Sequence, residues 1–406
     1  MKVKAIVFAV SCLLFFFAAA AERGAQGVGV DGFRAGEVNV ELLPGVDIET
    51  INLRYGTSLL DEISGAQQYR LQLPPGERVE EAVERLGHDL EILFVQPNYL
   101  YLSPEVRQTS QAFVDQTSQA FVDHSAPAKY WEQGQVQRLG VEEAHAWSRG
   151  TGVRVAVIDT GIDLNHPLFA GRLVGPAYDF VSKDLDPGEE MGGAGAGHGT
   201  FVAGLIALIA PEASILPLRA FNRDGRGEAF NIAKAIRYAD ENGAMIINLS
   251  FGLFQEDKLI KSALGAVYER AYMVASAGND NLNSVHFPAS VKSKTISVTS
   301  TNAADRKAPF ANYHVDVMAA APGENLYSAY PGGRWAVWSG TSFSTALVTG
   351  EAALLRALDP QANRTRLNTI ITTSGVSLNG LNPFYAGKLG RRIDLPRAIH
   401  GLLMRE

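Results

Sequence analysis

From Val153 onward, near-continuous runs of apolar residues alternate with segments in which apolar positions recur at helical spacing. The apolar runs are 153–159, 244–250, 271–277, 294–300 and 316–320. Such runs are typical of strands that are buried on both faces of a parallel sheet. The helical patterns are Gly199–Ile209, Ala229–Asn242, Asp257–Arg270 and Ser342–Leu358. This alternation predicts a three-layer α/β domain, in which a mostly parallel sheet has helices on both faces.

The region before this domain has a different pattern. Apolar and polar residues alternate in part at Glu37–Leu43 and Gln67–Leu73, and Ile92–Tyr101 returns to strand character. Helical spacing covers Asp47–Tyr55 and Arg78–Leu86. Strands and helices in this order predict a small α+β module over residues 22–106.

An exact tandem repeat separates the two regions. Gln108–Asp115 and Gln116–Asp123 both have the sequence QTSQAFVD. A unit of this length is too short for a solenoid, and two copies cannot bury a core. We therefore expect a flexible linker over residues 107–124 and a large domain over residues 125–406.

The N-terminus has the pattern of a secretory signal peptide over residues 1–21. Lys2 and Lys4 precede an apolar run that ends at Phe17, and four alanines follow it. The run is short for a membrane span, so an uncleaved anchor is the weaker alternative. Cys12, the single cysteine, lies inside this segment, so the mature chain would contain neither disulfides nor a thiol nucleophile. We expect an exported protein, located in a periplasm or outside the cell.

Composition narrows the class of partner. The chain has 406 residues, of which 46% are hydrophobic, and a formal net charge of −7. No block of Lys or Arg provides an electrostatic footprint for nucleic acid or an anionic membrane surface. We expect a monomer that binds no nucleic acid and, after signal cleavage, no membrane.

Four polar residues lie where apolar strands end or where helices begin. They are Asp159 after the first run, His198 in the glycine-rich GAGHGTFVAG, Asn279 in ASAGND and Ser342 in SGTSFSTALVTG. Taken singly, each has an ordinary structural explanation as a turn residue, a packed histidine or a helix cap. In layered α/β domains, however, sites form beyond the carboxyl ends of the strands, where these residues would meet.

Together they occur in the order Asp…His…Ser, which is the order of the catalytic triad in subtilisin. The segments VAVIDTGID, GHGTFVAGLIA, NLSFG, ASAGND and SGTSFSTALVTG resemble the blocks of the subtilisin-like serine peptidases. The resemblance covers about Ser125 to Leu403 and includes the terminal RRIDLPRAI. A serine esterase of the α/β-hydrolase class would need a G-x-S-x-G elbow and a different order of residues, and neither is present around these residues.

The chemistry of peptide hydrolysis assigns each residue a role. Ser342 needs a neighbouring base, and His198 would accept its proton. Asp159 would hold the histidine ring and stabilise the imidazolium. Asn279 and the backbone N–H of Ser342 would donate to the oxyanion. A catalytically silent binding protein on the same fold remains the alternative, although all four positions are filled.

The resemblance also implies a substrate site and a propeptide. Ser250, Phe251 and Gly252 would line one substrate edge, and Gly225 and Gly227 the other, so that an extended peptide adds as a strand between them. Phe251 and Phe230 would favour apolar substrate side chains, or else serve only as core aromatics. The small module resembles the inhibitory, ferredoxin-like propeptide of the family, and the linker is a natural place for processing.

Three features depart from the family pattern or remain open. Leu168 stands where many members carry an aspartate for a structural calcium, so we assign no metal and no cofactor. The acidic stretch Asp184–Glu190 could bind calcium instead, but we interpret it as a solvated loop. Phe343 follows the serine where methionine is common, and its larger side chain could shift the start of the helix.

Overall fold

The computed structural model describes residues 32–103, 120–123 and 127–404. Its first module, residues 33–102, has the element order β-α-β-β-α-β. All pairings within the module are antiparallel, and the strand order is β2-β3-β1-β4, which is the ferredoxin-like arrangement. The elements are β1 (Phe33–Leu42), α2 (Ile48–Tyr55), β2 (Ser58–Ile63), β3 (Gln68–Gln72), α3 (Val79–Gly87) and β4 (Ile92–Leu102).

The module has a small apolar core of its own. Val38, Val40 and Leu71 from the sheet and Ile51 and Leu86 from the helices are completely buried in it. The side chain of Asp47 caps α2 by accepting a hydrogen bond from the backbone of the first turn. The strand β2 was not expected from the sequence, because most of its side chains are exposed at the edge of the sheet and show no apolar pattern.

The large domain is built on a nine-stranded sheet of order β16-β17-β13-β12-β11-β10-β6-β8-β7. Every pairing in it is parallel except that of the edge strand β16 with its neighbour β17. The prediction of a mostly parallel sheet is confirmed. The strands are β6 (Arg154–Asp159), β7 (Tyr178–Asp179), β8 (Ser214–Arg219), β10 (Ile246–Leu249), β11 (Tyr272–Ser276), β12 (Thr295–Thr301), β13 (Ala319–Pro322), β16 (Val376–Ser377) and β17 (Arg391–Arg392).

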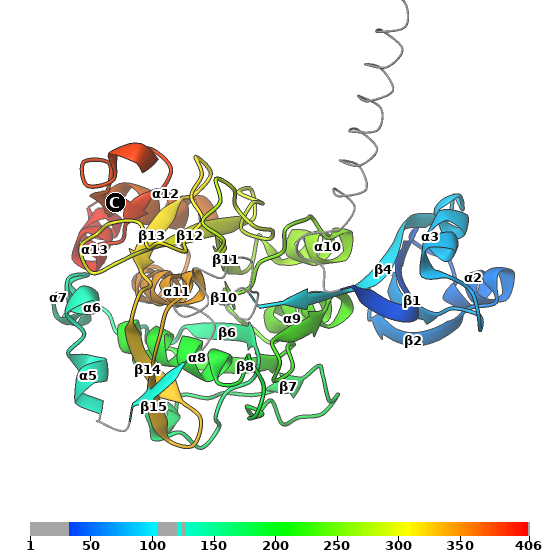
Figure 1. Ribbon diagram of the computed structural model, residues 1–406, viewed down its shortest axis with the longest axis horizontal. Helices are drawn as coiled ribbons and strands as arrows, with labels where there is room; N and C mark the ends of the chain where they lie inside the picture. The colour runs from blue at the N-terminus through cyan, green and yellow to red at the C-terminus, as the bar shows by residue number, and fades with distance from the viewer. Residues whose placement is uncertain (1–31, 104–119, 124–126, 405–406) are drawn as a thin grey trace, which may run out of the picture.

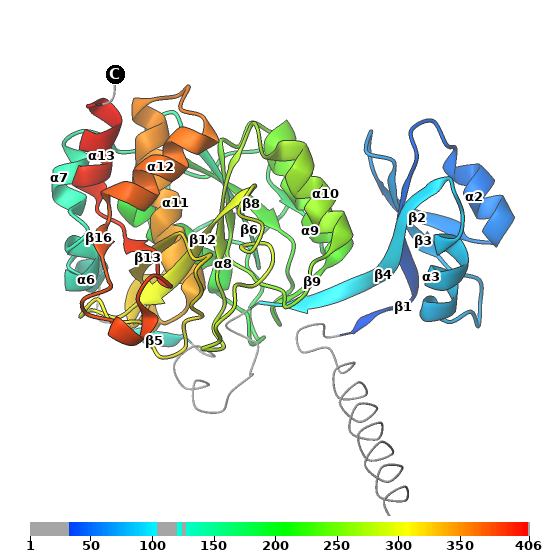
Figure 2. The same ribbon diagram turned by 90° about the horizontal axis from the view of Figure 1, so that it is seen from above.

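Helices cover both faces of this sheet, with α9 and α10 on one side and α11 on the other (Figure 2). The central strand β6 shows why its sequence is apolar throughout. Val155 and Val157 belong to the core beneath α8 and α11, whereas Ala156 and Ile158 belong to the core beneath α9 and α10. The helices of these two layers are α8 (His198–Ile209), α9 (Ala229–Glu241), α10 (Lys258–Val267) and α11 (Thr341–Leu358).

The remaining elements surround this core. Three short helices precede the sheet, and two longer ones close the chain beside α11 (Figure 1). They are α5 (Pro127–Trp131), α6 (Gly134–Gln137), α7 (Val141–His145), α12 (Arg364–Ser374) and α13 (Leu395–Leu403), with single turns at Pro167–Phe169 and Pro383–Tyr385. A separate three-stranded sheet contains β14 (Leu326–Tyr330), β15 (Arg334–Trp338) and β5 (Phe121–Asp123).

Two segments connect the first module with the large domain. The last residues of β4 extend beyond the module toward the large domain and pair antiparallel with β9 (Arg226–Glu228), which thereby adds to the sheet of the module (Figure 2). The end of the expected linker is the strand β5, which pairs with β15. Most of the tandem repeat lies outside the described residues.

Candidate active site

Asp159 and His198 form a buried pair at the carboxyl end of the sheet. Asp159 is the last residue of β6, and its Oδ1 atom lies 2.7 Å from Nδ1 of His198, the first residue of α8. The two residues are 3% and 1% exposed. The same oxygen accepts a hydrogen bond from the backbone N–H of Thr160 at 2.8 Å. This second hydrogen bond helps to hold the carboxylate in place beside the histidine. The contact with Asp159 therefore orients the imidazole ring of His198.

Ser342 lies in the first turn of α11 and is completely buried. The N-cap of α11 is Gly340, which has no side-chain capping bond, so the interpretation of Ser342 as a helix cap is wrong. Its hydroxyl donates instead to the carbonyl oxygen of Ser250 at 3.0 Å. Ser250 in turn donates its hydroxyl to the carbonyl oxygen of Ser342 at 2.9 Å. Two hydrogen bonds thus join Ser342 to the residue after β10, in the segment that is expected to line the substrate site.

Phe343, the residue after Ser342, packs against the histidine ring. Its ring centroid is 5.5 Å from that of His198 and 4.5 Å from that of Phe201 on the same helix, α8. Trp338 packs against the histidine ring edge-to-face at 5.7 Å. We expected that the larger side chain of Phe343 could shift the start of α11. In the structure this ring is part of a cluster of aromatic side chains that packs against His198.

Asn279 follows β11 and faces the start of α11. Its Oδ1 atom accepts hydrogen bonds from the backbone N–H of Thr341 at 2.9 Å and from its hydroxyl at 2.8 Å. Two donors on one oxygen determine which way the amide is turned, so the Nδ2 group lies at the other end. Thr341 is the residue before Ser342, and the amide is therefore anchored to the backbone directly beside Ser342.

The two expected substrate edges belong to separate segments of the large domain. Ser250, Phe251 and Gly252 follow β10, and Gly225 and Gly227 belong to the turn and strand of β9. A Cβ atom on Gly227 would meet the ring of Phe221 at 2.7 Å, which explains the glycine. Phe251 and Phe230 are both buried in the core beneath α9 and α10, so each serves at least as a core aromatic.

One carboxylate next to the pair was not anticipated. Glu189 lies in the stretch expected to be a solvated loop, but its Oε2 atom accepts hydrogen bonds from the backbone N–H and the hydroxyl of Thr200, at 3.1 and 2.8 Å. It thereby caps α8 from outside, where the N-cap Gly197 has no side chain to do so. Burial raises the pKa of Glu189 to about 7, and the nearby charge of Asp159 adds to the rise. The prediction that this whole stretch is a solvated loop is wrong for Glu189, whereas Asp184 and Asp186 are exposed.

A second buried histidine–aspartate pair supports the loop of Asn279. Nε2 of His286 lies 2.9 Å from Oδ2 of Asp280, and both side chains are nearly inaccessible. The ring also lies where a Cβ atom on Gly252 or Gly278 would stand, 2.9 and 2.6 Å away. Neither Glu189 nor this pair has a sequence signal, because each is defined by contacts with residues far along the chain.

The chain matches a known protein family. Residues 150–387, more than half of the chain, match the subtilase family of peptidases. The chain belongs to the subtilase family. Residues 19–98 match the fervidolysin N-terminal prodomain, so the first module is from here on called the prodomain.

Individual subtilases show how far the similarity extends. Thermitase from Thermoactinomyces vulgaris is 34% identical over 63% of this chain and 94% of its own length. Subtilisin BL from Lederbergia lenta is 33% identical over 59% of this chain and 88% of its own. The structure is also similar to that of fervidolysin from Fervidobacterium pennivorans, with a TM-score of 0.75 and 22% identity over 91% of this chain. This chain spans 61% of the fervidolysin chain, and at that identity the likeness concerns the fold.

The protein is therefore a serine endopeptidase of the subtilase family with an N-terminal prodomain. The structure brings all four expected polar residues to one end of the sheet. At the position expected to lack a calcium ligand, Leu168 is a nearly buried apolar side chain in the turn Pro167–Phe169. Within the described residues, no group of three or more His, Cys, Asp or Glu side chains is placed to hold a metal ion.

Proposed function

We propose that this subtilase is an exported endopeptidase that is made as a self-processing zymogen, with Asp159, His198 and Ser342 as its catalytic triad. The observation that carries the proposal is the buried contact between Asp159 and His198 beside the start of α11. The apolar N-terminus supports export. Among the described residues, no helix has both the length and the apolar character needed to cross a membrane. We propose that a single copy acts on extended peptides.

The residues perform the reaction in two steps. The Ser342 hydroxyl turns from the Ser250 carbonyl to His198, and its oxygen attacks the substrate carbonyl carbon as Nε2 takes the proton. The imidazolium, stabilised by Asp159, then gives this proton to the leaving amine, and the C–N bond breaks. An ester to Ser342 remains. Water attacks this ester by the same route, releases the acid and returns the proton to Ser342.

Asn279→Leu is expected to lower kcat by about 10²–10³-fold with little change in KM, a magnitude known from subtilisin itself. The reason is that Nδ2 of Asn279 would donate more strongly to the charged oxygen of the tetrahedral intermediate than to the neutral carbonyl oxygen of the bound substrate. The measurement is steady-state hydrolysis of one peptide by the matured enzyme. Asn283→Leu, at an exposed position of the same loop, is the control and is expected to retain most of the activity. An equal loss in both variants would show that the loop, and not the donor, had been changed.

The prodomain occupies the substrate edge as a substrate strand would. Leu100, Tyr101 and Leu102 pair with Glu228, Gly227 and Arg226 in an antiparallel ladder. The ladder continues as the backbone N–H of Ser103 donates to the Gly225 carbonyl at 2.8 Å. Main-chain pairing of this kind holds an extended peptide irrespective of its sequence. We infer that the prodomain blocks the site until it is cut and released.

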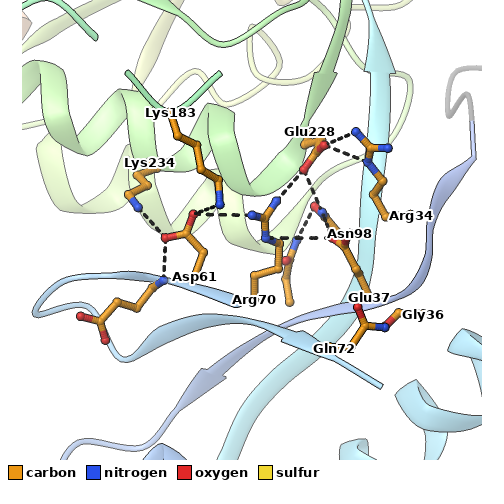
Figure 3. A network of polar contacts seen from close by, with 12 residues as sticks. Arg34, Gly36, Glu37, Asp61, Arg70, Gln72, Asn98, Lys183, Glu228 and Lys234 are labelled. Carbon is orange, nitrogen blue, oxygen red and sulfur yellow. Dashed lines mark hydrogen bonds and ion pairs between the residues drawn. The ribbon is translucent and has the colours of Figure 1, made fainter. Parts of the chain in front are cut away.

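Charged side chains fasten the prodomain beside this ladder (Figure 3). Arg70 of β3 is nearly buried and lies between two carboxylates, donating to Oε2 of Glu228 at 2.7 Å and lying 3.6 Å from Oδ2 of Asp61. Glu228 belongs to the large domain and also accepts from Arg34 at 2.8 Å. Asp61 belongs to the prodomain and accepts from Lys234 of α9 at 2.6 Å. A cation of the prodomain thus pairs with a carboxylate of the large domain, and a cation of the large domain pairs with a carboxylate of the prodomain.

Arg70→Met is expected to shorten the lag before activity appears after folding, because it leaves Glu228 and Asp61 without their shared buried cation. Removing one partner of a buried pair costs about 3–5 kcal/mol, part of which Arg34 and Lys234 offset. We therefore expect the cut prodomain to dissociate at least ~10-fold faster. Arg34→Met is the matched control, because that side chain is 53% exposed and its loss is expected to cost under about 1 kcal/mol.

The same time course tests the proposed function. Full-length protein is folded and then followed for hydrolysis of unfolded casein and for free prodomain. We expect activity to rise as the prodomain is released. A wild type that never hydrolyses casein contradicts the endopeptidase assignment to this triad. Activity that is complete while the prodomain is still bound contradicts only its inhibitory role.

A further inference from the structure

Asp257 is a buried carboxylate whose two oxygens serve different partners. It is the N-cap of α10 and is 1% exposed. Its Oδ1 atom accepts a hydrogen bond from the backbone N–H of Ile260 at 2.9 Å, as an ordinary cap does. Its Oδ2 atom accepts from the hydroxyl of Tyr101 at 2.8 Å and from Nε2 of Gln96 at 2.9 Å. Both of these donors belong to the prodomain.

Tyr101 reaches Asp257 from the substrate edge. It lies opposite Gly227 in the ladder between β4 and β9, and its side chain is completely buried. It belongs to the same cluster of buried residues as Ala229, Phe251 and Leu259 of the large domain. The tyrosine ring is thus enclosed by apolar residues, and its hydroxyl ends on a carboxylate.

We propose that Asp257 is a specificity-determining residue that selects a tyrosine in the substrate, at the position that pairs with Gly227 once the prodomain has left. This inference rests on the proposed function, because it takes the β4 strand as a guide to how a substrate lies. Backbone pairing with β9 does not depend on the side chains of the substrate, and Asp257 would add a requirement for one particular side chain.

The physical reason is the cost of an unsatisfied buried acceptor. When the prodomain leaves, Oδ2 loses both donors, and a substrate tyrosine restores one of them. A phenylalanine fills the apolar part of the pocket equally well but covers the carboxylate without a donor. A site built to bind a hydroxyl discriminates against the analogue that lacks it far more strongly than an apolar pocket discriminates by size. For one hydrogen bond to a charged acceptor we expect a preference for tyrosine over phenylalanine on the order of 10–100-fold.

The experiment begins with the matured wild-type enzyme and a complex mixture of peptides. Cleavage products are identified by mass spectrometry and aligned on the cut bond. We expect tyrosine to be enriched over phenylalanine at one fixed position upstream of the cut. Two synthetic peptides that differ only by tyrosine or phenylalanine at that position then give the ratio of kcat/KM. Burial raises the pKa of the Asp257 carboxyl, so the assays are run at alkaline pH.

Two variants separate recognition from folding. Asp257→Ser keeps a side chain that caps helices well but is too short to reach the hydroxyl, and is expected to bring the ratio close to one. Asp257→Asn keeps the size and removes the charge, and is expected to give an intermediate ratio. Both are expected to hydrolyse the phenylalanine peptide at least as fast as the wild type, because its ring no longer covers a carboxylate that lacks a donor. A rate far below that of the wild type would show that the substitution had damaged the site.

Each outcome has a distinct meaning. A wild type that cleaves peptides with no excess of tyrosine at any upstream position overturns the inference and leaves the proposed function standing. Enrichment of lysine at that position also overturns it, because the pocket would then select charge. A preference for tyrosine that persists in Asp257→Ser assigns the selectivity to other residues. A wild type that cleaves nothing overturns the proposed function itself.

Discussion

Ser342→Ala is expected to lower kcat for peptide hydrolysis by about 10⁶-fold, a magnitude known from subtilisin itself. The variant keeps the buried pair of Asp159 and His198 but has no oxygen to form the ester. Binding and oxyanion stabilisation remain, so a residual rate above that of the uncatalysed reaction is expected. The alanine also removes the hydrogen bond to the Ser250 carbonyl, which is small beside the loss of the nucleophile.

The measurement has to separate lost chemistry from a retained prodomain. The variant is freed of its prodomain by brief digestion with wild-type enzyme, which is then inactivated by a serine-directed reagent to which the variant is inert. Initial rates on one peptide are compared with those of Ser344→Ala, in which a neighbouring buried hydroxyl that donates to the backbone of β13 is removed. Ser344→Ala is expected to stay within about tenfold of the wild type. Comparable losses in the two variants would argue against Ser342 as the nucleophile.

Asp159→Ala is expected to lower kcat by about 10⁴-fold with little change in KM, again a magnitude known from subtilisin itself. The Oδ1 atom of Asp159 is the partner given by the structure for Nδ1 of His198, at 2.7 Å. Without it, the ring loses the hydrogen bond that would select its tautomer, and the imidazolium formed during attack loses its counter-charge.

Steady-state kinetics of the matured variant provide the test. Asp240→Ala is the control, because it removes a carboxylate that pairs with Arg270 at the surface. The control is expected to match the wild type within about twofold. A KM that rises as steeply as kcat falls in Asp159→Ala would point to a damaged substrate site instead of a disabled base.

The architecture was predictable because burial on two faces leaves a strong local signal. Every residue of β6 from Val155 to Asp159 is buried, and successive side chains enter opposite cores. An edge strand leaves no such signal. β2 has mostly exposed side chains, and its pairing with β3 is what makes it a strand.

The pairing of β4 with β9 could not be predicted from the sequence, for a related reason. The last residues of β4 were expected to end a module, but they also pair with β9 on the far side of the linker. Backbone hydrogen bonds impose few requirements on side chains, so no residue type marks that partnership. The resemblance to a family suggested a propeptide, and the structure shows which of its residues pair with β9, the strand that we propose binds substrate.

The residues of the candidate site also fall into two groups, those that the sequence predicts and those that it does not. Asp159, His198, Asn279 and Ser342 stand in recognisable local motifs, and the structure brings them together. Glu189 and Asp257 do not, because each acts through a contact with a residue in another element, Thr200 in one case and Tyr101 in the other. Such residues are identified by burial and by hydrogen-bond partners, which no local pattern encodes.

The measurement that tests the central claim most directly is the intact mass of full-length wild type and Ser342→Ala, each incubated after folding. The account predicts that the wild type loses an N-terminal fragment ending between about Tyr101 and Ser125, while the alanine variant stays whole. A wild type that stays whole, or a variant that is cut at the same bond and rate, would contradict self-processing by Ser342.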